Sequence, residues 1–133
     1  MIDYKKKFEN KNKIAFIIGG SGLIGSECVA ILKMSGAKIV VLDKNSNFSS
    51  IKKKKNSDIF YNYFDCSNLN TIDKNLNKII KKYGCPDILV NCSYPKTNKW
   101  KSNSFNKIKL KELKNNLEIH LTSFAWIARY IAN

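Results

Sequence analysis

The sequence is almost without arginine. Arg129 is the single arginine among 24 basic residues, and with only 10 acidic residues the formal net charge is +14. A charge of this size permits nonspecific adhesion to polyanions, but arginine is the side chain that reads guanine and stacks on bases. Lysine, asparagine and isoleucine are residues that an AT-rich coding sequence tends to supply. We therefore expect no dedicated binding of nucleic acid.

Histidines, closely spaced cysteines and long apolar runs are missing as well. One histidine and four cysteines without a Cys-x-x-Cys pair give no zinc pattern, so we expect no metal site and free, reduced thiols. No run of about 18 apolar residues exists that would span a membrane. The N-terminus imitates a secretory signal, but polar residues 9–13 and the glycines Gly19, Gly20 and Gly22 interrupt it. We therefore expect a cytoplasmic protein with no membrane span.

The sequence does contain an alternation of apolar runs and helical stripes. Runs typical of buried strands lie at 14–18, 37–43, 58–65 and 86–91, and helical periodicity lies at 21–36, 68–84 and about 108–132. A polar segment at 44–56 is expected to hold a short exposed helix, and a second polar segment covers 92–107. This order predicts one α/β domain over residues 1–133. Its parallel Rossmann-type sheet would carry helices on both faces and stop after about four strands and the fourth helix.

A glycine-rich turn joins the first predicted strand to the first helix in the segment FIIGGSGLIGSE, residues 16–27. Gly20-x-Gly22-x-x-Gly25 fits the dinucleotide-binding fingerprint, and Gly19-x-x-Gly22-x-x-Gly25 fits a related spacing. Glycines there permit a tight turn, the approach of a pyrophosphate and close packing of helix on strand. A turn that serves packing alone is the alternative. The predicted cofactor-binding residues of this segment are Gly19, Gly20, Ser21, Gly22, Leu23, Ile24 and Gly25.

An acidic residue, Asp43, ends the second predicted strand. Its distance from the glycines is close to the separation of about 20 residues at which an acid binds the adenosine ribose hydroxyls. A carboxylate at that place repels a 2′-phosphate, which favours NAD over NADP as the cofactor. Lys44 follows directly and softens that preference.

The motifs resemble the short-chain dehydrogenase/reductase family over residues 12–131. The glycine turn stands where the family has Thr-Gly-x-x-Gly-x-x-Gly, with Ile18 in place of threonine. The resemblance implies an NAD(P)-dependent oxidoreductase that transfers a hydride between the nicotinamide and a hydroxyl or carbonyl substrate. It also implies that Asp65, followed by Cys66, approaches the adenine ring. The family's Asn-Asn-Ala-Gly segment, which borders the cofactor, corresponds here to a stretch containing Asn91, Cys92 and Ser93.

Residues beyond the fourth predicted strand are candidates for the substrate end of the site. His120 stands where the family has an asparagine of the proton relay, which implies a catalytic role; a half-buried helix histidine with a satisfied ring nitrogen is the alternative. Tyr94, Lys96 and Trp100 would line a substrate site, unless the aromatic residues only anchor the loop. The stretches SYPKTNKW and IHL resemble a subgroup linked to flagellin modification and nonulosonic-acid pathways, which implies a sugar derivative as substrate.

The family's catalytic Tyr-x-x-x-Lys pair is absent from this sequence. Spacing of four places both side chains on one helix face, where the tyrosine exchanges a proton with the substrate oxygen. We therefore expect the N-terminal half of the family's domain, without the catalytic half and inactive alone. A fragment of an active enzyme is the account we favour; one half of a split enzyme and a non-catalytic nucleotide-binding module are the alternatives. We expect the full-length protein to be a homo-oligomer. The rest of the enzyme or another subunit would cover the apolar face of the last helix, which includes Leu117, Leu121, Phe124 and Ile127.

Overall fold

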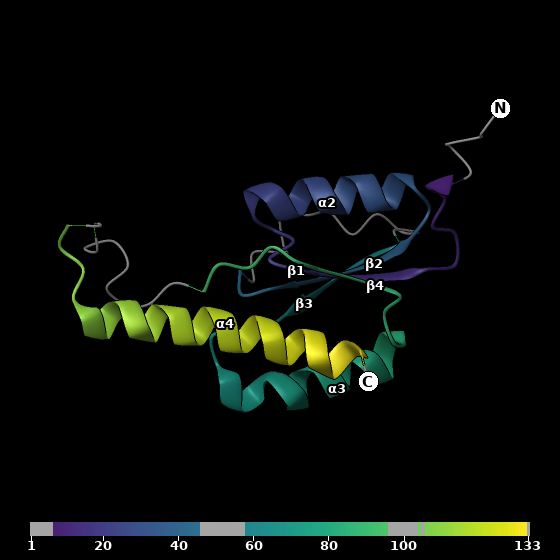
Figure 1. Ribbon diagram of the computed structural model, residues 1–133. Coiled ribbons are helices and arrows are strands. Elements are labelled where there is room, and N and C mark those ends of the chain that lie inside the picture. Colours follow the sequence, from purple (N-terminus) through teal and green to yellow (C-terminus); the bar gives the residue numbers. More distant parts are fainter. Residues whose placement is uncertain (1–6, 46–57, 96–103, 105, 133) are drawn as a thin grey trace.

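The computed structural model describes residues 7–45, 58–95, 104 and 106–132. In them, four parallel strands form one sheet in the order β3-β2-β1-β4 (Figure 1). The strands are β1 (Ile14–Ile18), β2 (Lys38–Asp43), β3 (Ile59–Tyr63) and β4 (Ile88–Asn91). The helices are α2 (Leu23–Met34), α3 (Ile72–Tyr83) and α4 (Leu110–Ala132), with a 3-10 turn η2 (Leu69–Thr71) before α3. The predicted parallel α/β sheet is confirmed, whereas most of the predicted short helix at 44–56 lies outside the described residues.

The two central strands are buried on both faces, which is why they read as continuous apolar runs in the sequence. Successive side chains along a strand point to opposite faces of the sheet. One face of β1 and β2 packs toward α3 and α4 through Phe16, Ile18, Val40 and Leu42. The other face packs toward α2 through Ala15, Ile17, Ile39 and Val41.

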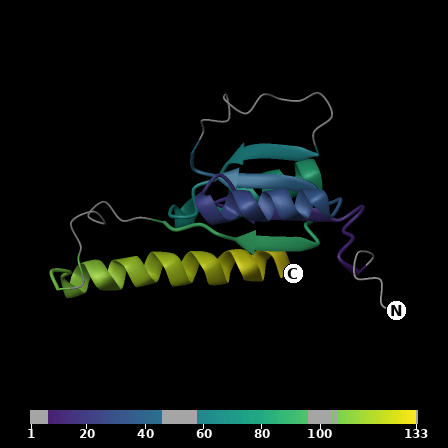
Figure 2. The same cartoon turned by 90° about the horizontal axis from the view of Figure 1, so that it is seen from above.

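The helices form one layer on each side of the sheet. Figure 1 shows α2 above the sheet and α3 with α4 below it, and Figure 2 shows α4 running beside β4. α3 is amphipathic and buries Ile72, Leu76 and Ile79. α4 contributes the fully buried Ile127 to the same core, and the Trp126 indole N–H donates to Asp73 Oδ1 on α3.

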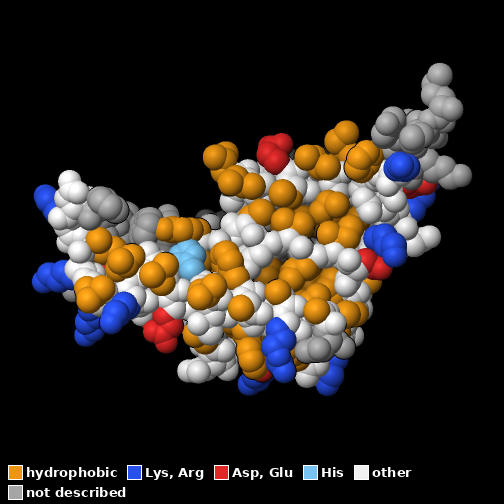
Figure 3. Space-filling view, viewed as in Figure 1, with side chains coloured by type: hydrophobic (Ala, Val, Ile, Leu, Met, Phe, Trp, Pro, Cys, Tyr) orange, Lys and Arg blue, Asp and Glu red, His pale blue; other side chains and the backbone are white. Residues whose placement is uncertain are grey.

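The sheet is open along β4. Among the described strands, β4 pairs only with β1, and all of its residues are half-buried. The predicted apolar face of α4 is only partly covered by the described residues: Ile127 is buried, but Leu117 and Leu121 are 60% and 73% exposed. Figure 3 shows hydrophobic side chains gathered over β4 between α2 and α4. The described part of the chain therefore leaves one side of its core uncovered.

Candidate functional site

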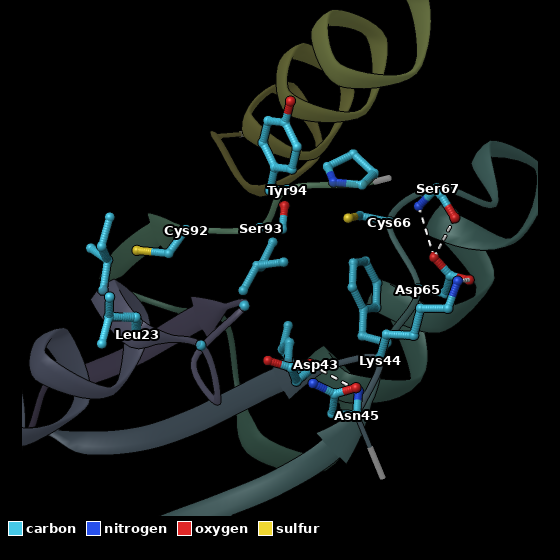
Figure 4. Close-up of a pocket in the computed structure, with 18 residues that line it drawn as sticks. Leu23, Asp43, Lys44, Asn45, Asp65, Cys66, Ser67, Cys92, Ser93 and Tyr94 are labelled. Carbon is cyan, nitrogen blue, oxygen red and sulfur yellow. Dashed lines mark hydrogen bonds and ion pairs between the residues drawn. The ribbon is translucent and has the colours of Figure 1, made fainter. Parts of the chain in front are cut away.

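A cavity of about 620 Å³ opens at the carboxyl ends of the strands (Figure 4). β1 lies between β2 and β4, so the direction of the strand order reverses beside it. Ligands of open parallel sheets bind at such a reversal. The cavity collects most of the predicted cofactor residues, namely Gly19, Gly22, Leu23, Ile24, Gly25, Asp43, Asp65, Cys66, Cys92 and Ser93.

Two glycines of the turn are required by the chain's own packing. Gly19 has φ of +73°, and a Cβ on it would lie 2.8 Å from the Cys92 carbonyl carbon and the Ser93 nitrogen. A Cβ on Gly25 would lie 2.1 Å from the Gly19 carbonyl oxygen. Neither position accepts a side chain without a backbone shift, because the contacts are to main-chain atoms. At this turn, β1 and α2 therefore lie in close contact with the segment that follows β4.

Gly22 differs from the other glycines of the turn. It lines the cavity, and a Cβ on it would meet only the Gly19 carbonyl oxygen, at 3.2 Å. Gly20, by contrast, does not line the cavity, and a Cβ there would lie 2.8 Å from Val41 Cγ1 of β2. Packing within the chain therefore accounts for Gly19, Gly20 and Gly25. A Cβ on Gly22 would be tight against one backbone oxygen only, and its absence widens the cavity at its wall, as the approach of a phosphate requires.

The amino-terminal end of α2 faces this cavity. Gly22 is its N-cap residue and offers no side-chain hydrogen bond, and the first turn carries no acidic residue. The first N–H groups of a helix have no partner within the helix, and the helix dipole makes that end electropositive. Leu23, Ile24 and Gly25 of this turn line the cavity. This end of the cavity therefore suits an anionic pyrophosphate.

Asp43 provides acceptors beside the turn. The carboxylate is 8% exposed; its Oδ2 accepts from the Ser21 backbone N–H at 2.9 Å, and its Oδ1 accepts from the Asn45 backbone N–H at 2.9 Å. A carboxylate offers about four acceptor sites, so capacity remains for hydroxyl donors such as a ribose diol. Ser21 does not line the cavity, and its contact with Asp43 indicates that it joins the turn to β2.

Asp65 also lines the cavity and is held by two neighbours. Its Oδ1 accepts from both the backbone N–H and the hydroxyl of Ser67, at 3.0 and 2.6 Å, and its Oδ2 lies 3.1 Å from Lys44 Nζ. Burial opposes ionisation, but the hydrogen bonds from Ser67 and the ion pair with Lys44 outweigh it and lower the pKa of Asp65. The same hydrogen-bonded pair raises the pKa of Lys44. Sequence reasoning gave no role to Ser67 and did not foresee this pairing.

The segment after β4 forms the opposite wall. Asn91 pairs with Ile18 in the β1–β4 register and does not line the cavity. Its side-chain oxygen instead accepts from the backbone N–H and the hydroxyl of Ser93, at 3.1 and 2.6 Å. Burial, and then the neighbouring Cys28 thiol, raise the pKa of the Cys92 thiol. Asn91 therefore shapes the turn that presents Cys92 and Ser93 to the cavity.

His120 lies outside the cavity lining but contacts a residue within it. Its ring centroid is 4.4 Å from that of Tyr94, which lines the cavity, and 5.8 Å from that of Phe124. Its Nε2 is buried and has no hydrogen-bond partner among the described residues, as is the case for Asn116 Oδ1 one helical turn earlier. The predicted substrate residue Lys96, like Trp100, lies outside the described residues.

The described residues contain neither a membrane-spanning helix nor a cluster of metal-binding side chains. None of their helices combines the length and apolar character needed to cross a bilayer. No three side chains of histidine, cysteine, aspartate or glutamate gather there in a way that would hold a metal ion.

This chain is similar to known proteins in both sequence and structure. The short chain dehydrogenase family model matches residues 13–133. The post-translational flagellin modification protein A of Campylobacter coli is 28% identical over 120 residues, which are 86% of this chain and 46% of that protein. A short chain dehydrogenase from Leptospira borgpetersenii serovar Hardjo-bovis, solved with bound NAD+, is similar with a TM-score of 0.72 and 22% identity, over 98% of this chain and 48% of that one.

A third similar structure is the Pseudomonas aeruginosa RhlG/NADP active-site complex, with a TM-score of 0.75 and 16% identity, over 99% of this chain and 50% of that one. These structural similarities support the fold. The chain spans less than half the length of the curated relatives that it matches, at 30% and 46%. The family model, by contrast, covers nearly all of this chain. The chain therefore belongs to the short-chain dehydrogenase family, whose members bind NAD(P).

Proposed function

We propose that this chain binds the adenosine diphosphate part of a nicotinamide dinucleotide, with NAD preferred, as the cofactor-binding half of a hydride-transferring oxidoreductase. The observation that carries the proposal is that the glycine turn, Asp43 and Asp65 line one cavity at the ends of three neighbouring strands. The electropositive first turn of α2 supports phosphate binding, and Asp43 supports binding of ribose hydroxyls. The nicotinamide would supply the hydride chemistry, while this chain binds and orients the cofactor.

The preference for NAD rests on the charge at the end of β2. The Asp43 carboxylate is buried, and its two hydrogen bonds to backbone N–H groups hold it in place. A phosphate on the ribose 2′ oxygen would bring about two further negative charges against this carboxylate. The cation next in the chain, Lys44, is already paired with Asp65. Both arguments favour a cofactor without the 2′-phosphate.

Fewer contacts support the proposed substrate-binding end of the cavity than support the nucleotide-binding end. His120 takes the relay position of the family, and its buried Nε2 has room in its hydrogen bonding for a water or substrate group. Tyr94 joins it to the cavity and, with Lys96, would contact the substrate. The resemblance supports a small hydroxyl or carbonyl compound, and the flagellin-modification relative is compatible with a sugar derivative.

Calorimetric titration of the 133-residue chain with ADP-ribose, NAD+ and NADP+ tests the proposal. We expect ADP-ribose and NAD+ to bind, and NADP+ to bind more weakly. We also expect no NAD+ reduction by this chain alone with simple alcohols or sugars, because it carries no Tyr-x-x-x-Lys pair. Absence of binding at millimolar ADP-ribose would reject the nucleotide site, and reduction of NAD+ would reject the dependence on a further catalytic segment.

A second candidate is a chain that binds nucleotide and acts only when another polypeptide completes it. The open β4 edge and the exposed Leu117 and Leu121 of α4 favour this candidate. The in-frame coding sequence after residue 133 discriminates between the two. A serine and a Tyr-x-x-x-Lys pair encoded there would support a single-chain enzyme, and their absence would support a split enzyme or a binding module.

A further inference from the structure

We infer that Asp65 determines the choice between NAD and NADP by holding the Lys44 ammonium group away from the ribose 2′ position beside Asp43. The inference rests on the proposed nucleotide-binding function and deepens it. It assigns the selectivity to an ion pair between the ends of two strands, β2 and β3, rather than to the Asp43 carboxylate alone.

The two partners of this ion pair differ in how firmly they are held. Asp65 is 20% exposed, and both the backbone N–H and the hydroxyl of Ser67 bind its Oδ1, which leaves Oδ2 toward Lys44 (Figure 4). Lys44 is 66% exposed, on a flexible four-carbon stem. Asp65 is therefore the fixed partner, and Lys44 is the one that is drawn to it.

Because Lys44 lies next to the proposed ribose acceptor, its pairing with Asp65 affects how a 2′-phosphate is received there. Lys44 directly follows Asp43, the proposed ribose acceptor, and both residues line the cavity. Asp43, Lys44 and Asp65 are the only charged residues among those that line the described cavity. While Lys44 is paired with Asp65, no other cation of the cavity lining is available to pair with the Asp43 carboxylate. A 2′-phosphate then meets a carboxylate without a nearby counterion, and NADP binds weakly.

Removal of the Asp65 charge reverses this arrangement. In Asp65→Asn the amide oxygen still accepts from Ser67, but the ammonium group of Lys44 loses its ionic partner. The lysine can then pair with a 2′-phosphate. We expect the ratio of the Kd of NADP+ to the Kd of NAD+ to fall about three- to fivefold, the effect of one partly exposed ion pair. Both ligands carry the same adenine, so a change in any adenine contact of Asp65 cancels in the ratio.

Titration calorimetry with NAD+ and NADP+ at low salt, on four variants, tests the inference. Lys44→Met should leave the ratio within about twofold of the unmodified chain, because the lysine does not serve the 2′ position while Asp65 holds it. The double variant Lys44→Met/Asp65→Asn should lose the gain of Asp65→Asn. Asp58→Asn, which removes the same charge just before β3 at the opposite end of that strand, should leave the ratio unchanged.

The outcomes separate the two claims. If the unmodified chain binds neither ADP-ribose nor NAD+, both the proposed function and this inference fail. If NAD+ binds but Asp65→Asn leaves the ratio unchanged, or the double variant keeps the gain, only the inference is wrong. A several-fold rise of the ratio in Lys44→Met would also overturn it, even if Asp65→Asn failed to fold, because Lys44 would then already serve the 2′-phosphate.

Discussion

The backbone N–H of Ser21 donates a hydrogen bond of 2.9 Å to Asp43 Oδ2. This contact joins the glycine turn after β1 to the carboxyl end of β2. The proposed phosphate and ribose parts of the site are therefore directly connected by a hydrogen bond. A change at Asp43 therefore acts on the turn as well as on any bound ribose.

Replacement of Asp43 by alanine should weaken NAD+ binding by about tenfold or more and NADP+ binding by less. The carboxylate acceptor for the ribose is lost for both cofactors, but only NADP+ gains from the removed repulsion. Calorimetric titration of the two cofactors measures the difference.

Asp43→Asn is the control for this experiment, because its amide oxygen can still accept from the Ser21 N–H while the charge and the second acceptor, which serves the Asn45 N–H, are gone. If the alanine variant weakened both cofactors equally, Asp43 would act only through the turn.

Alanine replacements at two glycines of the turn should have different effects, one mainly on the stability of the fold and the other mainly on ligand binding. Gly25→Ala places a Cβ 2.1 Å from the Gly19 carbonyl oxygen, so we expect a free energy of unfolding lower by about 1–3 kcal/mol or more. Gly22→Ala meets one backbone oxygen at 3.2 Å and should cost less stability than Gly25→Ala, yet weaken ADP-ribose binding because the added methyl group narrows the cavity at its wall. Urea unfolding and calorimetry measure the two effects. Equal loss of stability in both variants would contradict the assignment of Gly22 to the ligand.

The Asp65 ion pair should make stability depend on acid pH. The pKa of Asp65 is lower in the folded chain than its ordinary value of about 3.9, so ionised Asp65 stabilises the fold above that pH, and the contribution is lost as pH falls through the lowered value. The Tm difference between the unmodified chain and Asp65→Asn should be present near about pH 6 and should shrink as the pH falls below the ordinary value of about 3.9. A difference that stayed constant over this range would argue against the pair.

His120 is the only histidine in the chain, so its ring signals can be assigned in an NMR spectrum without further variants. Tyr94 lines the cavity and lies 4.4 Å from the His120 ring, centroid to centroid. NAD+ binding that moves Tyr94 should therefore shift the His120 ring protons through the ring current of the tyrosine.

Tyr94→Leu serves as the control, because it removes the ring current while it keeps an apolar contact. A His120 signal that does not respond to saturating NAD+ in the unmodified chain would remove the link between this residue and the cofactor cavity.

The sheet and the glycine turn could be predicted because both follow from local sequence. Strands buried on both faces require continuous apolar runs, and Gly19 and Gly25 stand where a side chain would strike the backbone. The pairing of Lys44 with Asp65 could not be predicted, because it depends on how the ends of two strands align across the sheet. The contact of Tyr94 with His120 likewise depends on where a long helix packs against a loop.

β4 is the last of the four strands in the described residues, yet its partner is the first. The register joins Ala15 to Ile88 and Ile18 to Asn91, and none of the strand pairs is a hairpin. Pairings this distant in sequence form slowly, because a long loop must close before any contact rewards it. During synthesis, β1 can pair with β2 early, but its second edge stays open until residue 91 has been made. The strand that leads into the proposed phosphate site is thus the one whose pairing is completed last.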